Sequence, residues 1–342
     1  MIRQLVLVLA FGLSHAQWAR NRTEWKSWVK SHNNDTDSTW KAKISPNITY
    51  EDETALRRMI GASLSPNAQE ALVTAPKRNR LLQADNFPTT YDLRTVYPRC
   101  ASISLIRNQF SCGACWAFSA MTSLSDRTCI KTHGQRIATQ RSWSFQDALE
   151  CCDAATCGTG PNQGCNGGYI DGAFKFAQRT GVVTGEDLTD TTQCKPYFVN
   201  SFINAVAPSC RNHCTNPLYR RSYTADRMRI IGYKAYSLSV MTKADLISAV
   251  KEALIRRGTL VAYMDIYYDI YTYSSGVYRT NGVNKLGAHA VRLIGWGTDP
   301  AGGDFWLLAN SWGPFWGEKG FFRIAQGINS SGIETYIVEG VV

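Results

Sequence analysis

The chain has 342 residues, 44% of them hydrophobic and 19% charged, and a formal net charge of +10. This balance excludes an intrinsically disordered chain and favours one or two globular domains with a real core. The basic residues are scattered, with no run of five or more, which favours a solvated basic surface over a nucleic-acid site.

The N-terminus has the pattern of a secretory signal peptide, predicted for residues 1–16. Arg3 supplies the positive start, residues 5–13 the short apolar core, and Ser14-His15-Ala16 the small-residue cleavage site. That core is too short to span a bilayer, and no later segment predicts a membrane helix. Sequons for N-glycosylation begin at Asn21, Asn34, Asn47 and Asn329.

Residues 17–86 differ from the rest because they contain no cysteine and three of the four sequons. Trp18, Trp25 and Trp28 recur near helical spacing, which predicts a helix seated on a partner surface. A second helical patch is expected near residues 51–60, followed by a loose, basic stretch up to residue 85. The residues alone fit a small N-terminal domain with a linker as well as a propeptide.

The remaining chain changes from helical to strand-like patterns, which predicts an α+β fold. Helices are expected at 115–128, 141–152, 169–180 and 243–257. Strands are expected at 230–233, 258–264, 290–296 and 305–310.

All eleven cysteines lie after residue 87, and an odd count in a secreted chain leaves one thiol free. Two other interpretations of these cysteines are a redox pair and a zinc site. Cys112 and Cys115 have the spacing of a thioredoxin-like redox pair, but no βαβ pattern surrounds them. The cluster Cys151, Cys152, Cys157 and Cys165 lacks the paired C-x-x-C spacing of a zinc site, so no metal is expected.

Four residues have the types that thiol-dependent peptide hydrolysis needs. Cys115 begins an apolar, helix-like run, and a helix N-terminus lowers the pKa of a thiol. His289 is the candidate proton carrier and Asn310 the group that orients it. Gln109 is the candidate donor to the oxyanion.

The motifs around these residues resemble the papain-like cysteine proteases, and cathepsin B in particular. They are Gln109-Phe110-Ser111-Cys112-Gly113-Ala114-Cys115-Trp116, Gly287-Ala288-His289-Ala290 and Asn310-Ser311-Trp312-Gly313. The resemblance implies a papain-like two-domain fold behind a propeptide. Its expected parts are a signal peptide (1–16), a propeptide (17–86), a helical domain with the nucleophile (87–205) and a barrel-like, β-rich domain with the histidine and asparagine (206–342).

The resemblance also implies the cysteine pairing and the substrate contacts. The implied disulfides are Cys100–Cys129, Cys112–Cys165, Cys151–Cys210, Cys152–Cys157 and Cys194–Cys214, which leave Cys115 free. The implied substrate-binding residues are Gly167, Gly168, Tyr169, Ala290, Trp312 and Tyr336. Trp312 is further expected to cover the bond between His289 and Asn310.

We therefore expect a cysteine endopeptidase, made as a zymogen, in a lysosome or outside the cell. Its expected partners are peptide and protein substrates, its own propeptide and cystatin-type inhibitors. No cofactor, nucleic acid or membrane span is implied, and a monomer is expected. The alternative is a non-enzymatic secreted binding protein on the same fold.

Departures from the family pattern carry their own expectations. Phe110 stands where glycine is usual, and Ala114 where serine is frequent. Tyr336 holds the position of the acidic residue in the S2 pocket, which favours apolar P2 residues unless Glu334 turns in. The loop 195–209 is short and has no histidine. This predicts weak or absent carboxydipeptidase activity, with His213 or Lys195 as the only substitutes for a carboxylate anchor.

Overall fold

The computed structural model describes residues 22–50, 52–66, 68–73, 87–134, 141–157, 164–187, 191–198, 209–280 and 282–342. Four features predicted above lie outside these residues. They are the signal peptide, Asn21 with Trp18, the basic stretch 74–86, and most of the loop 195–209.

Helices and strands are interspersed along the chain. The helices are α1 (Arg22–Asn34), α2 (Glu53–Arg57), η1 (Ala68–Ala71), α3 (Leu93–Val96), α4 (Ala101–Ser104), α5 (Cys115–Lys131), α6 (Phe145–Cys151), α7 (Ala154–Cys157), η4 (Gly164–Asn166), α8 (Ile170–Arg179), α9 (Tyr223–Asp226), α10 (Lys243–Arg257), η5 (Tyr268–Thr272) and η6 (Ser330–Gly332). The strands are β1 (Trp40–Ala42), β2 (Ala62–Ser63), β3 (Tyr91–Asp92), β4 (Gly168–Tyr169), β5 (Gly232–Tyr236), β6 (Leu260–Tyr267), β7 (Tyr273–Tyr278), β8 (Lys285–Asp299), β9 (Gly303–Ala309), β10 (Phe321–Ala325) and β11 (Ile337–Val341).

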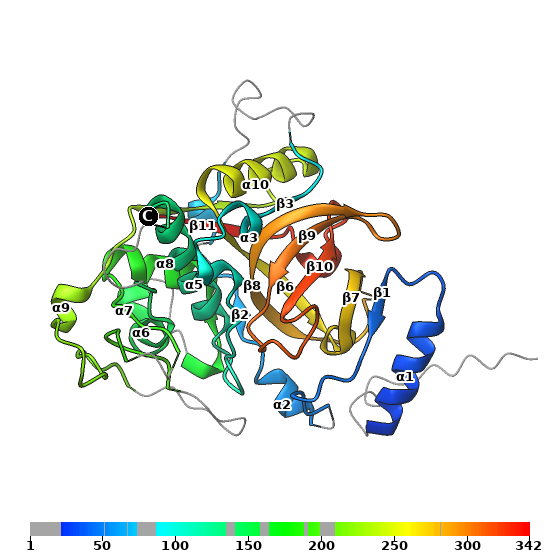
Figure 1. Ribbon diagram of the computed structural model, residues 1–342, viewed down its shortest axis with the longest axis horizontal. Coiled ribbons are helices and arrows are strands. Elements are labelled where there is room, and N and C mark those ends of the chain that lie inside the picture. The colour runs from blue at the N-terminus through cyan, green and yellow to red at the C-terminus, as the bar shows by residue number, and fades with distance from the viewer. Residues whose placement is uncertain are drawn as a thin grey trace, which may run out of the picture.

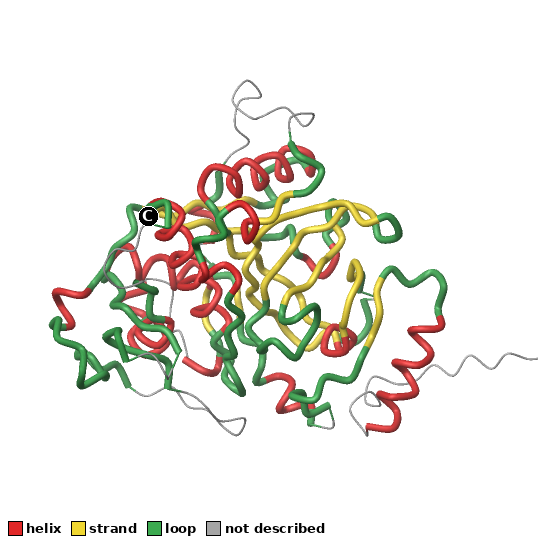
Figure 2. The backbone as a smooth tube through the Cα atoms, in the orientation of Figure 1, coloured by secondary structure: helices red, strands yellow, loops and turns green. Residues whose placement is uncertain are grey.

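The helices between residues 115 and 226 gather on one side of the molecule and most strands of the main sheet on the other, whereas α1, α2 and α10 lie around the strands (Figure 1). Figure 1 shows α5 to α9 together on one side and β6 to β10 on the other, and Figure 2 shows the same division by colour. The predicted α+β class is confirmed. The domain boundary at residues 205 and 206 stays a prediction, because β3 lies early in the chain and yet pairs with β8.

The main sheet is built around the long strand β8. Its order is β1-β7-β10-β9-β8-β6-β11-β5, with β3 paired to β8 off this path. Almost every pair is antiparallel, and β10 with β7 is parallel. The path is open and ends at β1 and β5, so the barrel-like expectation holds only as a curved arrangement of strands and not as a closed barrel.

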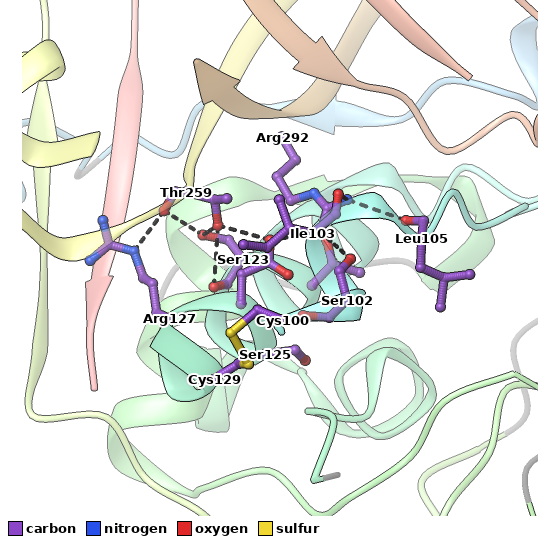
Figure 3. Close-up of polar contacts among 12 residues, drawn as sticks. Cys100, Ser102, Ile103, Leu105, Ser123, Ser125, Arg127, Cys129, Thr259 and Arg292 are labelled. Atoms are coloured by element: carbon purple, nitrogen blue, oxygen red, sulfur yellow. Dashed lines mark hydrogen bonds and ion pairs between the residues drawn. A yellow bond between two sulfur atoms is a disulfide. The ribbon is translucent and has the colours of Figure 1, made fainter. Parts of the chain in front are cut away.

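Helix α5 connects the two sides through a buried polar network (Figure 3). Arg127 Nε and Ser123 Oγ donate to the carbonyl of Thr259 at 2.6 and 2.9 Å. Arg292 of β8 donates to the carbonyls of Ser102 and Ile103 at 3.0 and 3.1 Å. Burying these polar groups without partners would cost free energy, and the bonds provide the partners. The bonds to Thr259 fix α5 against the start of β6, and those from Arg292 fix α4 against β8.

The N-terminal segment, here the described residues before 74, runs along the strand side and then across to the helices (Figure 1). Trp25 of α1 is buried and its ring lies 5.1 Å from Tyr50 and 6.3 Å from Tyr268. Strand β1 pairs antiparallel with β7, with Trp40 opposite Gly276. The predicted helix of tryptophans therefore does rest on a partner surface.

Candidate active site

Cys115 is the first residue of α5 and is fully buried. All eleven cysteines lie in the part of the chain that the structure describes, and Cys115 is the one outside a disulfide. The bridges are Cys100–Cys129, Cys112–Cys165, Cys151–Cys210, Cys152–Cys157 and Cys194–Cys214, the pairs that the family resemblance implies. The second of them holds the turn before α5.

His289 lies on β8, between β9 and β6, and is buried. Ser119, one turn after Cys115 on α5, donates to the carbonyl of Ala290 at 2.7 Å. Because residues four apart share a helix face, this bond brings the Cys115 end of α5 against the His289 position of β8. Ala290 also supplies a backbone hydrogen bond that favours the thiolate of Cys115.

Asn310 follows β9 and orients the histidine ring. Its Oδ1 lies 2.8 Å from His289 Nε2 and also accepts from the Ser311 N–H. Because the partner atom is an acceptor, Nε2 carries the proton and Nδ1 keeps a lone pair. Nδ1 is buried and has no hydrogen-bond partner among the described residues. The ring of Trp312 packs 4.9 Å from that of His289, consistent with a cover over the bond.

Burial sets the protonation of the pair in this state. It raises the pKa of the Cys115 thiol to about 12, although backbone hydrogen bonds from Ala290 and Gly61 oppose the shift. Burial also lowers the pKa of His289 to about 4, although its bond with Asn310 opposes that shift. Both groups are therefore neutral while the N-terminal segment covers them, and the thiol is not nucleophilic.

The N-terminal segment passes directly over the thiol. The N–H of Gly61 donates to the Ala288 carbonyl at 3.1 Å, and the N–H of Gly168 donates to the Gly61 carbonyl at 2.8 Å. A Cβ on Gly61 would lie 2.4 Å from the Gly113 carbonyl oxygen, and one on Gly167 would lie 2.9 Å from that of Gly61. Only glycines permit so close an approach of three backbones. Strand β2 then pairs in parallel with β4.

The oxyanion donor predicted at Gln109 is occupied. Its Nε2 donates to the Met59 carbonyl of the N-terminal segment at 3.1 Å and to the Cys112 carbonyl at 2.7 Å. Trp312 Nε1 donates to the same Met59 oxygen at 2.9 Å. A main-chain carbonyl thus lies where the indole and amide donors converge. Sequence reasoning missed Ser311, whose hydroxyl donates to Gln109 Oε1 and sets which way the amide points.

The remaining predicted substrate contacts lie along the same passage. Gly167, Gly168 and Tyr169 border it on the helical side, and Ala290 and Tyr336 are buried beside it. Tyr336 donates its hydroxyl to the Ala68 carbonyl at 3.2 Å. Glu334 does not turn toward this place. Its fully buried carboxylate accepts from Trp306 Nε1 at 3.0 Å and from the Gly327 N–H at 2.6 Å, so that alternative is wrong.

Of the two substitutes for a carboxylate anchor, Lys195 is not free to bind a substrate carboxylate. The Lys195 ammonium is fully buried and donates to Asp147 Oδ1 at 2.7 Å and to the Arg211 carbonyl at 2.6 Å. It is a structural cation, and its candidacy as an anchor is wrong. His213 is exposed, and residues 199–208 of the loop lie outside the described part of the chain.

Two predicted glycosylation sites, Asn34 and Asn47, are exposed. The side chain of Asn329 is instead engaged on both sides, accepting from the Glu334 N–H at 2.8 Å and donating to Thr335 Oγ1 at 3.4 Å. Among the described residues, no cluster of three metal-ligating side chains occurs and no helix is long and apolar enough to cross a bilayer.

Comparisons with known proteins agree on one family. The family model described as "Papain family cysteine protease" matches residues 87–341. "Cathepsin B-like cysteine proteinase 4" of Caenorhabditis elegans is 37% identical over 92% of this chain and 91% of its own length. The "Gut-specific cysteine proteinase" of the same organism is 37% identical over 85% of this chain and 83% of its own length. The solved "proCathepsin B S9 from Trypanosoma congolense" is 26% identical, with a TM-score of 0.73 over 92% of this chain and 97% of that one.

Proposed function

Since this chain belongs to the papain family of cysteine proteases, we propose that Cys115 attacks the scissile peptide carbonyl and that His289 carries the proton. The chain is a cysteine peptidase of cathepsin B type, built as a zymogen. The alternative of a non-enzymatic binding protein has no observation in its favour.

The observation that carries the proposal is the state of the His289 ring. Asn310 engages Nε2 at 2.8 Å, while Nδ1 is buried without a partner among the described residues. The bond from Ser119 to Ala290 brings that ring to the α5 end that bears the free thiol. A lone pair kept free beside a thiol is what a proton transfer from Cys115 requires.

The reaction runs in two steps. The Cys115 thiolate adds to the carbonyl carbon, the C–N bond breaks, and His289 protonates the leaving amine. Water, deprotonated by His289, then attacks the thioester and releases the acid and the thiol. Gln109 Nε2 and the Cys115 N–H donate to the oxyanion in both steps, once the Met59 carbonyl has left.

The N-terminal segment is the inhibitor in this scheme. Its Met59 carbonyl occupies the Gln109 donor and its Gly61 covers the thiol. Cleavage near residues 78–87, in a basic stretch, would release it under acid conditions. A lysosomal or extracellular location, a monomeric state and inhibition by cystatin-type proteins complete the proposal.

Endopeptidase action is the finer part of the proposal. Lys195 is buried in an ion pair, and the loop 195–209 contains no histidine, so neither supplies a free cation for a substrate's C-terminal carboxylate. A peptide with a free C-terminus and its C-terminal amide should be cleaved at similar rates. A strong preference for the free acid, with stepwise loss of dipeptides, would point to His213 instead.

The catalytic assignment is tested on the processed enzyme. Cys115→Ala and His289→Ala should abolish hydrolysis of a fluorogenic peptide, and Gln109→Ala should lower kcat about 100-fold, the usual cost of one oxyanion donor. Asn310→Ala should be milder, because Asn310 orients the ring and transfers no proton. Substantial turnover by Cys115→Ala would end the thiol-protease assignment.

A further inference from the structure

Asp171 is a fully buried aspartate in the first turn of α8, two residues after Tyr169 of β4. Its Oδ2 accepts a hydrogen bond from Ser65 Oγ of the N-terminal segment. Its Oδ1 is buried and has no hydrogen-bond partner among the described residues. A buried carboxylate oxygen without a donor is rare, because it forfeits hydration without compensation.

This carboxylate borders the place that Tyr336 closes. Tyr336 contacts Ala68 of the N-terminal segment three residues after Ser65, and Ala62, Ala68, Ile170 and Tyr336 belong to one apolar cluster. The Ala68 N–H donates to the Ser65 carbonyl at 3.0 Å, so a single turn of the segment contacts Asp171 through Ser65 and Tyr336 through Ala68. Residues of the N-terminal segment therefore fill a subsite that has an aspartate in its wall.

Lys175 determines which ligands suit this aspartate. Its ammonium lies 3.3 Å from Asp171 Oδ2, one helical turn along α8, and both side chains are almost fully buried. A second cation would be repelled by Lys175 at this distance. A neutral donor meets no such repulsion, and the Ser65 hydroxyl already shows that such a donor fits.

The size of the occupant is also restricted. Ala62, Ser65 and Ala68 are the buried residues of the N-terminal segment from β2 to η1, and all three are small, whereas the larger Leu64 packs against the same cluster and is only partly buried. Small side chains therefore match the space that the segment leaves when it departs.

We propose that Asp171 makes this S2 subsite select a small hydrogen-bond donor, serine or threonine, over an apolar side chain of the same size. The proposal deepens the proposed function and rests on it, since the same cleft must bind the substrate. It differs from the expectation of apolar P2 residues, which considered Tyr336 and Glu334 but not Asp171.

The test uses the processed enzyme and peptides that differ only at P2, with threonine, its isostere valine, arginine or phenylalanine. Threonine should exceed valine in kcat/KM by about tenfold or more, the usual value of a hydrogen bond to a charged acceptor. Asp171→Ala should remove this ratio by lowering only the threonine rate. Asp171→Asn keeps the shape and one acceptor oxygen, so part of the ratio should remain.

Asp245, in the first turn of α10, provides a matched control, because Asp245→Ala also removes a helix-start carboxylate. It should leave the threonine to valine ratio unchanged. Equal rates for the two peptides with wild-type enzyme would overturn the proposal without any variant. Arginine as the best P2 residue, lost in Asp171→Asn, would overturn it in favour of cation recognition. Failure to cleave all four peptides, together with no labelling of Cys115 by a thiol reagent, would refute the proposed function instead.

Discussion

At the scale of single residues, Phe110 shows strain beside the catalytic machinery. Its φ is +54°, in the left-handed region that bulky side chains avoid, and its N–H is held by Asn108 Oδ1 at 2.8 Å. The glycine usual at this family position is explained by that backbone angle. Phe110 adopts it because Gln109 and Ser111 on either side are fixed in the buried turn before α5.

A pair of substitutions separates this strain from the packing of the ring. Phe110→Gly and Phe110→Ala both remove the ring, but only glycine accepts a positive φ freely. The glycine variant should therefore be more stable than the alanine variant by about 1–2 kcal/mol. Denaturant unfolding of the full chain in a Cys115→Ala background measures the difference. Equal midpoints for the two variants would show that the backbone at position 110 leaves its positive φ in the alanine variant at no cost.

At the scale of elements, the docking of α1 and β1 depends on a histidine. The ring of His32 lies 5.0 Å from Trp28 and 4.0 Å from Trp40, and Nε2 contacts Ser38 Oγ at 3.1 Å. Burial lowers the pKa of His32, the carbonyl of Trp40 and the charge of Asp35 oppose that shift, and the charge of Lys41 adds to it.

The sign of this shift predicts acid-induced release. A docked His32 with a lowered pKa binds fewer protons than a released one. Docking of the segment therefore becomes less favourable as the pH falls below about 6.5. His32→Phe keeps a stacked ring without the charge, and should move zymogen conversion to lower pH. The pH of half-conversion measures this.

Glu53 of α2 also stabilises the docked segment, but it should lose this effect at a lower pH than His32 does. Hydrogen bonds from Tyr268 and Arg57 lower its pKa, so its contribution to docking is lost only as the pH falls below about 4.5. Glu53→Gln should raise the zymogen's basal activity at neutral pH. An unchanged pH of half-conversion in His32→Phe would exclude the histidine as the sensor.

Elements with their own signals were predictable from the sequence. The helix expected at 243–257 has the bounds of α10, because Thr242 caps its start and Gly258, with φ of +93°, ends it. The two-residue strands β2 and β4 had no such signal, since they form only where segments about a hundred residues apart meet.

Cys115, His289 and Asn310 were predicted from their residue types and the motifs around them. Asp171 was not, because its role depends on neighbours distant in sequence.

At the scale of the whole molecule, Glu339 of β11 ties three parts together. It accepts from Arg127 of α5 at 2.8 Å, from Arg257 of α10 at 2.7 Å and from Tyr236 of β5 at 2.6 Å. Burial alone would raise the pKa of Glu339, but the two arginines and the tyrosine outweigh it and lower the pKa to about 2. Its stabilising effect is thus complete above about pH 4.5 and is lost as the pH falls toward 2.

Glu339→Gln should therefore destabilise the fold by roughly 3–5 kcal/mol near neutral pH, because it leaves the buried Arg127 and the half-buried Arg257 without their counter-charge. Glu252→Gln removes a surface ion pair with Arg256, whose side chain is exposed, and should change stability by less than about 1 kcal/mol. Urea unfolding at pH 7 compares the two variants. Similar midpoints would mean that the network carries no net stability.

Removal of the N-terminal segment should also change the reactivity of the thiol. Because burial raises the pKa of Cys115 to about 12 in the full chain, iodoacetamide should label it very slowly at pH 6. After processing, the thiol is solvated and labelling should be fast, and His289→Ala should slow it again. Equal labelling rates before and after processing would show that the segment does not control the thiol.

The covered thiol also bears on oxidative folding. Eleven cysteines must yield five disulfides, and an unpaired thiolate attacks such bonds by thiol–disulfide exchange. Cys115 lies three residues from Cys112, whose bridge to Cys165 frames the same turn. A protonated thiol beneath Gly61 cannot make that attack, so the segment acts as a protecting group until the bridges are complete. A chain lacking the segment should accumulate scrambled isomers in which Cys115 is bridged, and disulfide mapping of the refolded product would reveal them.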